Sequence, residues 1–297
     1  MIWKDTHAYM YIYIYICMHA CAQVPEADDN AEWRRQRLTT AEFIKRQWEK
    51  GNRISPIFYV FGVETYLFRV DWLHAVDQGV GADFAGNVFE TLLPKLPGNN
   101  QRERCHILNE RIQKFYERRG TEDKLKCFDE ASIKRPSKNQ PAKLKGGAAV
   151  VRNLIPFVKE FADDECDDSV PREAGIKIAA THLTHCYQAL ARSSACCRDE
   201  ALYSSSQAFV SQVHALYLTG DGVSFRCKPK THLFLELCSQ PGVLPNAFWC
   251  YRDEDFGGPI ARQSKFVGRW KNLTTYSRHA FDMFFMKNKV PRIVAVT

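Results

Sequence analysis

Apolar residues recur every three or four positions in four successive segments between Gln101 and Gly220. An α-helix places residues with this spacing on one face, which has to be buried against another element. The four faces consist of Ile107, Leu108, Ile112, Phe115 and Tyr116; Val150, Leu154, Phe157, Val158 and Phe161; Ile176, Ile178, Leu183, Tyr187 and Leu190; and Leu202, Phe209, Val213, Leu216 and Tyr217. Four such faces bury one another in an α-helical bundle, which is the structure that this stretch predicts.

A further helix is expected after Asp71, where apolar residues recur every four positions up to Pro94. Its apolar positions are Val76, Val80, Phe84, Val88 and Leu92. Gly79, Gly81 and Gly86 weaken this helix by up to about 1 kcal/mol each. Small residues at these positions also permit close packing against a neighbouring element.

The N-terminal flank adds a little β-structure to the helical pattern. Thr39 and Glu42 have the spacing of a capping box, so a helix is expected from there to Gly51. Two short runs rich in aromatic and β-branched residues, Ile57–Phe61 and Tyr66–Val70, predict strands. The predicted fold class is therefore α+β, predominantly α-helical.

Three other regions complete the expected organisation. Lys134–Gly147 is polar, basic and contains Pro and Gly, so it predicts an exposed connection. The apolar positions of Leu233–Leu237 predict a helix, and further helices are expected after Asp253 and after Thr275.

The first 22 residues differ from the rest of the chain. Alternating Tyr and Ile over Tyr11–Ile16 is what a repeated TA dinucleotide encodes, and Cys17–Cys21 is what a repeated tetranucleotide encodes. We interpret the segment as a translated microsatellite of disordered or irregular structure. The alternative is a secretory signal, because the apolar run Ala8–Ala22 ends in a small-x-small sequence. The run is shorter than the roughly 20 residues that span a bilayer, so no membrane partner is expected.

Composition excludes a disordered chain and a disulfide scaffold. Of 297 residues, 45% are apolar and 25% charged, which is enough to bury one or two cores. The eleven cysteines form no regular framework and no Cys-x-x-Cys pair. We interpret them as reduced thiols of an intracellular protein, which would be secreted only if residues 1–22 act as a signal.

Two acidic motifs far apart in the sequence have the composition of a split metal site. Asp71-Trp72-Leu73-His74 follows the second predicted strand, and Arg252-Asp253-Glu254-Asp255 begins a predicted helix. Phosphoryl-transfer enzymes hold two divalent ions about 4 Å apart with carboxylates from separate elements. The motifs are therefore candidates for the site of a DNA-cutting enzyme.

Several motifs follow one another along the chain. Asp71-x-x-His74 with Gly79 comes first, and a long helical segment follows it. Lys228-Pro229-Lys230-x-His232-Leu233 comes next, and Trp249-x-Tyr251-Arg252-x-Glu254 precedes Gly257-Gly258. This order resembles the second half of an RNase H-like transposase of the cut-and-paste, CACTA-type group. It is more similar still to a set of transposon-derived reading frames abundant in some algal genomes. The resemblance covers about residues 54–273 and implies a partial RNase H-like core with few strands, interrupted by a large α-helical insertion.

The resemblance also implies a set of site residues. It assigns catalytic roles to Asp71, Glu254 and His74, with Asp71 bridging two ions, Glu254 holding one, and Asp255 as the alternative metal ligand to Glu254. His74 would orient a carboxylate or contact the scissile phosphate. An active enzyme of this kind needs Mg²⁺ or Mn²⁺, because carboxylates suit hard cations.

Four segments are expected on this basis. Residues 1–27 form a low-complexity region, and 28–98 form the N-terminal helix with partial RNase H-like strands and helix. Residues 99–225 form the α-helical insertion, and 226–297 form C-terminal helices with the third acid and a basic tail.

Positive charge gathers near the C-terminus. Residues 257–297 hold eight Lys and Arg against one acid, interleaved with aromatic residues. The candidate DNA-binding residues are Arg262, Lys265, Arg269, Lys271, Arg278 and Lys287. Such a surface suits contacts to the phosphates of duplex DNA in the nucleus, although a solvated helix face explains it equally well. A second basic region, 101–161, has fifteen Lys and Arg against eight acids.

Each motif also has a structural interpretation. Asp71 is well placed as a helix N-cap, and the acids after Arg252 suit the first turn of a helix. His182-x-x-His185-Cys186 has ligand spacing on a helix, yet a helix-surface or core role is expected without a second cluster. The prediction of catalysis therefore depends on the resemblance to the transposase family.

The family's first catalytic Asp is missing, since the sequence before Asp71 offers only Asp5, Asp28 and Asp29, outside strand-like runs. The chain is therefore expected to be a truncated transposase frame whose metal site binds ions poorly. Two hypotheses stand: a metal-dependent DNA transposase or nuclease, and a non-catalytic helical remnant that binds DNA or protein.

Overall fold

The computed structural model describes residues 38–52, 54, 56–59, 61–65, 70–135, 137–192, 199–239 and 245–247. The chain divides into two compact units, Met1–Trp249 and Cys250–Thr297, and every described residue belongs to the first. Several predicted features therefore lie outside the described residues. They are the segment 1–22, all but the last residue of the strand Tyr66–Val70, the helices after Asp253 and Thr275, and the basic tail.

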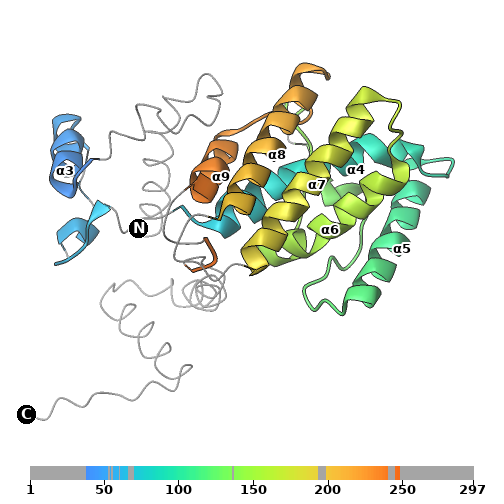
Figure 1. The fold of residues 1–297 in the computed structure, drawn as a ribbon, viewed down its shortest axis with the longest axis horizontal. Coiled ribbons are helices and arrows are strands. Elements are labelled where there is room, and N and C mark those ends of the chain that lie inside the picture. Colours follow the sequence, from blue (N-terminus) through green and yellow to red (C-terminus); the bar gives the residue numbers. More distant parts are fainter. Residues whose placement is uncertain are drawn as a thin grey trace, which may run out of the picture. The chain divides into compact units, whose positions relative to one another are not determined.

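The described part is predominantly helical, as predicted (Figure 1). Its seven α-helices are α3 (Thr40–Glu49), α4 (Ala82–Leu92), α5 (Gln101–Arg119), α6 (Ala148–Glu165), α7 (Pro171–Arg192), α8 (Glu200–Leu218) and α9 (Pro229–Ser239). A π-helix, η3 (Leu73–Gly81), runs directly into α4, and four short 3-10 turns are η1 (Pro56–Tyr59), η4 (Leu93–Lys95), η5 (Glu130–Ser132) and η6 (Pro245–Ala247). Strands β1 (Ile133–Lys134) and β2 (Lys143–Leu144) pair antiparallel, with Ile133 opposite Leu144.

The four amphipathic segments form helices α5 to α8, which confirms the predicted bundle. Helix α7 packs against both α6 and α8, and α8 packs against α9 (Figure 1). Buried apolar residues from the elements η3 to α9 form one hydrophobic core. Ile178 is the exception among the predicted core residues, since it is 47% exposed. It lies two positions from Ile176, on the opposite side of the helix from that buried residue.

Local signals at the N-terminal helix are confirmed. The Thr39 backbone N–H donates to Glu42 Oε2 at 2.8 Å, and the Glu42 N–H donates to Thr39 Oγ1 at 3.3 Å. This reciprocal pair is the capping box that the Thr39 and Glu42 spacing predicts. Helix α3 accordingly begins one residue after Thr39.

The strand predicted over Ile57–Phe61 is wrong. Pro56–Tyr59 forms the 3-10 turn η1, and Gly62 follows with φ +82°. A preference for strand depends on a neighbouring strand to pair with, and the described residues offer none here. The Phe58 ring instead packs against the Phe43 ring of α3, with the ring centroids 5.3 Å apart, whereas Tyr59 and Phe61 are exposed.

The exposed connection predicted over Lys134–Gly147 is also wrong in part. Strand β2 lies within it, and Ala142 and Leu144 are buried. Strand β2 packs on α4 at Gly86, where an added Cβ would lie 2.5 Å from the backbone of Lys143. The prediction that small residues in this helix permit close packing is confirmed.

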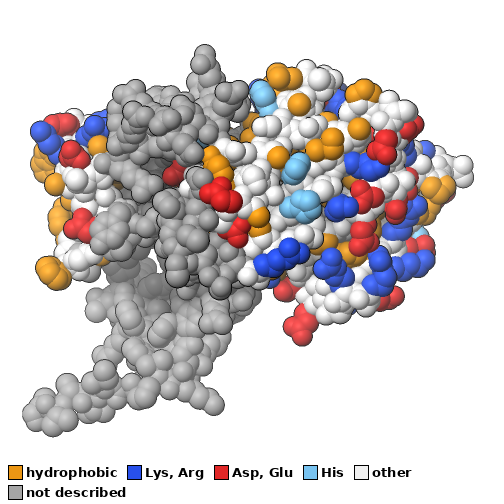
Figure 2. Space-filling view, viewed as in Figure 1, with side chains coloured by type: hydrophobic (Ala, Val, Ile, Leu, Met, Phe, Trp, Pro, Cys, Tyr) orange, Lys and Arg blue, Asp and Glu red, His pale blue; other side chains and the backbone are white. Residues whose placement is uncertain are grey.

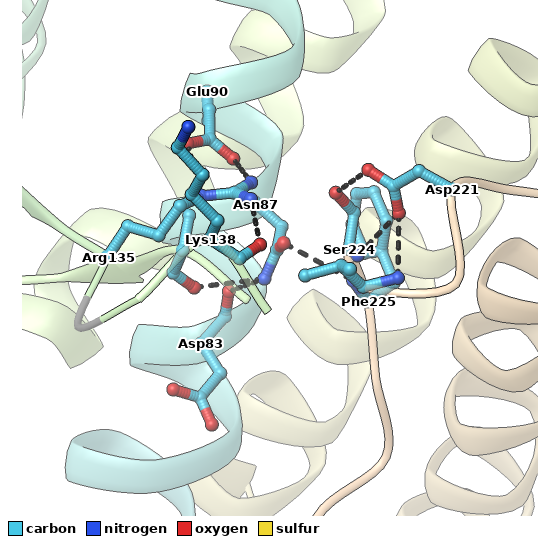
Figure 3. Close-up of polar contacts among 10 residues, drawn as sticks. Asp83, Asn87, Glu90, Arg135, Lys138, Asp221, Ser224 and Phe225 are labelled. Carbon is cyan, nitrogen blue, oxygen red and sulfur yellow. Dashed lines mark hydrogen bonds and ion pairs between the residues drawn. The ribbon is translucent and has the colours of Figure 1, made fainter. Parts of the chain in front are cut away.

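A buried amide joins α4 to two loops (Figure 3). Asn87 Nδ2 donates to the carbonyl oxygens of Asp83 at 2.7 Å and Ala142 at 3.0 Å. Its Oδ1 accepts the Phe225 N–H at 3.2 Å, and Phe225 adopts a positive φ of 59°. Asp221 supports the same loop by accepting the N–H of Ser224 at 2.7 Å. Asn87 thus uses both its donors and its acceptor to fix segments far apart in the sequence.

Replacing Asn87 by Ala should lower the free energy of unfolding by about 2–4 kcal/mol, because buried backbone groups at Ala142 and Phe225 lose their partners. Urea unfolding followed by circular dichroism measures the change. Asn153→Ala is the matched control, since Asn153 makes one hydrogen bond at the surface, to the Asp123 carbonyl oxygen at 3.2 Å. Its effect should stay within about 0.5 kcal/mol. Equal losses in the two variants would contradict the clamp.

Candidate functional site

Asp71 is the N-cap of the helix that begins with η3. Its Oδ2 accepts the backbone N–H of His74 at 2.9 Å, and its carbonyl oxygen accepts the N–H of Ala75 at 3.0 Å. The same Oδ2 lies 2.7 Å from Nδ1 of the His74 ring. The structural interpretation of Asp71 as a helix cap is therefore confirmed, and the His74 ring contacts the same carboxylate.

Trp72 anchors this motif in the core. The side chain is fully buried, and its ring meets the rings of Tyr187 and Phe234 edge-on, each at 5.7 Å. Tyr187 belongs to α7 and Phe234 to α9. Asp71 and His74, which are partly exposed, are consequently held where three elements meet.

Two lysines donate to the carbonyl oxygens of the π-helix. Lys230 Nζ lies 2.6 Å from the His74 oxygen, and Lys143 Nζ lies 2.5 Å from the Gln78 oxygen. The Lys230 stem crosses Gly79, where an added Cβ would lie 2.6 Å from Lys230 Cδ. Short π-helical stretches occur frequently at functional sites. Here the stretch receives a lysine from β2 and another from α9.

A third lysine completes a cluster, which we call the lysine cluster: Lys143, Lys228 and Lys230. Lys228 Nζ pairs with Asp83 Oδ2 at 2.9 Å. Burial lowers the pKa of Lys230, and the charges of Lys143 and Lys228 lower it further, against the opposite effect of Asp83. Burial also lowers the pKa of Lys143, with a further contribution from Lys228. The three ammonium groups therefore repel one another.

A buried acid lies beneath the motif. Asp77 is 0% exposed, and its Oδ1 accepts a hydrogen bond from the Tyr187 hydroxyl at 2.5 Å. Burial raises the pKa of Asp77 to about 7, although the Tyr187 hydroxyl and the Arg152 charge act in the opposite direction. The indole N–H of the adjacent Trp72 also acts to lower this pKa, although neither Asp77 Oδ2 nor Trp72 Nε1 has a partner in hydrogen-bonding geometry. A buried carboxyl with an unused oxygen is uncommon in native proteins.

The structure brings together only part of the predicted metal site. Asp71 and His74 meet, whereas Glu254 and Asp255 lie outside the described residues. Within the described ranges no group of three or more His, Cys, Asp or Glu side chains could hold a metal ion. Among the described residues, Asp71 therefore contacts His74 and lies near the positive charge of Lys230, which disfavours a divalent cation there.

The histidine motif of α7 serves the helix surface. The rings of His182 and His185 lie 6.3 Å apart and edge-on, while the neighbouring Cys186 is buried. The three side chains do not converge, so the expected surface or core role is confirmed. The six cysteines of the described part are all free thiols, namely Cys105, Cys127, Cys166, Cys186, Cys227 and Cys238.

The second basic region is partly paired with acids. Figure 2 shows Lys and Arg interspersed with Asp and Glu over the face that carries α5 and α6. Arg111 lies 2.5 Å from Glu165, and Arg118 lies 2.8 Å from Glu160. This face therefore presents less net charge than its lysines and arginines alone suggest. The six candidate DNA-binding residues of the tail lie outside the described residues.

Sequence reasoning missed several residues of this site. Asp77 follows Ala75 and Val76 within the buried stripe of the helix, and an acid in that position was the available signal. Lys228 and Lys230 belong to a motif of the resemblance but received no role. The sequence did not indicate a role for Lys143, because its position depends on the contact between β2 and α4.

Within the described ranges, no helix has both the length and the apolar character needed to cross a bilayer. Comparison with protein-family models, with curated proteins and with solved structures finds no match for this chain.

Replacing Asp77 by Asn should stabilise the protein at neutral and alkaline pH. Because the folded pKa of about 7 exceeds the ordinary value of 3.8, the unmodified protein loses stability as pH rises between these values. The increase in the pKa of Asp77 corresponds to a loss of folding stability on the order of 4 kcal/mol. Asn keeps an acceptor for Tyr187 without ionising, so the stability gain of the variant should grow from pH 4 to pH 8.

Urea unfolding at pH 4, 6 and 8 measures this difference. Asp123→Asn is the control, because Asp123 is exposed and its change should leave the pH profile unaltered. A constant difference between Asp77→Asn and the unmodified protein across pH would contradict a buried, ionisable Asp77.

Proposed function

We propose that the chain is a transposase-derived DNA-binding protein, ancestrally a metal-dependent DNA cleavage and strand-transfer enzyme. One observation carries the proposal: two motifs of the transposase resemblance, remote in sequence, meet in the fold. Lys230 of the Lys228-Pro229-Lys230 motif donates to the carbonyl oxygen of His74 in the Asp71-x-x-His74 motif at 2.6 Å. An RNase H-like core around these motifs and a nuclear location are parts of the same proposal.

Cleavage is the first form of this function, and it requires Glu254 or Asp255 to join Asp71. Mg²⁺ or Mn²⁺ held by these carboxylates would activate an oxygen nucleophile and stabilise the leaving oxygen of a phosphodiester. The residues of the chain itself contribute positioning. His74 holds the Asp71 carboxylate through Nδ1 at 2.7 Å, which fixes its orientation without a metal.

A non-catalytic DNA-binding remnant is the second form. It is favoured by the use of Asp71 as a helix cap and by the ammonium group of Lys230 near it. Positive charge disfavours a cation at Asp71 unless further carboxylates offset it. The same charge favours the phosphates of DNA.

A cleavage assay separates the two forms. If Glu254 completes the site, the full chain should nick supercoiled DNA in Mn²⁺, and Asp71→Asn or Glu254→Gln should each lower the rate by about 100-fold or more, since outer-shell changes alone lower activity about 10- to 100-fold. Asn caps helices as well as Asp does, so Asp71→Asn tests the charge without removing the cap.

Asp168→Asn, at an exposed carboxylate on the surface, is the control and should cleave like the unmodified chain. Equal nicking by the unmodified chain and both site variants would sink the metal-site assignment. Absence of nicking by the unmodified chain would leave the non-catalytic form.

DNA binding should depend steeply on salt. We expect the affinity for a duplex to fall linearly with salt on a log-log plot, with a slope near −0.9 for each phosphate contacted. Replacing Arg262, Lys265 and Arg269 together by Gln should make the slope less steep by up to about 2.7. Fluorescence anisotropy with a labelled duplex between 50 and 200 mM salt measures the slope.

Arg118→Gln is the matched control for the tail variant. Arg118 is paired with Glu160 on the α5 and α6 face, so its removal should leave the slope unchanged. A flat salt response of the unmodified chain would remove the proposal of phosphate contacts.

A further inference from the structure

The lysine cluster carries more positive charge than its neighbours neutralise. Asp83 pairs with Lys228, and Asp71 already accepts the His74 N–H and contacts the His74 ring. Burial lowers the pKa of both Lys143 and Lys230, and the charge of Lys143 lowers the pKa of Lys230 further. Among the described residues, two acids therefore face three ammonium groups, and a bound anion would relieve the imbalance.

The ammonium groups are also held in place before any ligand arrives. Lys143 is anchored to the Gln78 carbonyl oxygen and Lys230 to the His74 carbonyl oxygen. An ammonium group has three N–H donors, so each anchored lysine retains donors for a ligand. All three lysines are partly exposed, which leaves the cluster open to solvent. Anchoring lowers the entropy lost when a ligand binds.

We propose that Lys143, Lys228 and Lys230 form a binding site for a phosphate group beside η3. Three point-charge donors suit the several oxygens of a phosphate better than the two oxygens of a carboxylate. The site is distinct from the tail residues assigned to DNA binding, and it requires neither a metal ion nor Glu254. The phosphate belongs either to a nucleic-acid backbone or to a free polyphosphate.

Calorimetric titration of the full chain with pyrophosphate and, separately, with a short duplex DNA tests the site. Lys143→Gln and Lys228→Gln should each weaken binding about tenfold or more, because a charge-assisted hydrogen bond is lost. Lys114→Gln, at an exposed lysine of α5, is the control and should bind like the unmodified chain. Unchanged affinity of both cluster variants for both ligands would overturn the proposal.

Asp83→Asn separates a binding role from a structural one. The change releases Lys228 from its ion pair and removes a negative charge, so anion affinity should rise severalfold. If the lysines only support the fold, the same change should weaken binding or leave it unaltered, which would contradict the site. Circular dichroism confirms folding of each variant.

A measurement on the unmodified side chains guards against variants that fail to fold. Incorporated lysine labelled with ¹³C at Cε should show a rise in the pKa of Lys143 and Lys230 when pyrophosphate or duplex is added. A rise with both ligands indicates free polyphosphate as well as DNA, and a rise with duplex alone indicates the backbone. No rise with either ligand would overturn the site, whatever the cleavage assay shows.

Discussion

The described part of this protein depends on the close packing of β2 and α9 against one central helix. The helix runs from Leu73 to Leu92 through η3 and α4, and three of its residues have no side chain. A Cβ at Gly79 would meet Lys230 Cδ at 2.6 Å, and one at Gly86 would meet the Lys143 backbone at 2.5 Å. Such distances are below ordinary contact, so only glycine lets β2 and α9 lie this near. That proximity brings two lysines to the carbonyl groups of the helix.

The central helix also carries two buried polar side chains, Asn87 and Asp77, which differ in how completely they are hydrogen-bonded. Asn87 uses its full hydrogen-bonding capacity, which offsets the desolvation of its amide. Asp77 is bonded through one oxygen only, so its burial destabilises the charged form and raises its pKa to about 7. A neutral carboxyl needs less compensation than a charged one. The core therefore accommodates Asp77 mainly in its protonated state at acidic pH.

Electrostatics relate the two proposals to each other. Lys230 of the lysine cluster lies near Asp71, and its charge opposes a cation there. A phosphate bound to the cluster would lower that opposition, because it contributes negative charge close to the carboxylate. Phosphate binding and metal binding are consequently expected to favour one another. The lysine cluster alone accounts for anion binding if no third carboxylate joins Asp71.

The local sequence pattern was sufficient to predict the described bundle helices and the proximity of Asp71 and His74. Apolar spacing predicted α5 to α8, Thr39 and Glu42 predicted the start of α3, and the three-residue spacing of Asp71 and His74 places both on one turn. The strand over Ile57–Phe61 and the exposed connection over Lys134–Gly147 were wrong, because strand pairing and burial depend on partners distant in sequence. Lys143, Lys230 and Asp77 gained their roles only from such contacts. A helix closes its hydrogen bonds among near neighbours, whereas a site of this kind exists only once segments such as β2 and α9 pack on the central helix.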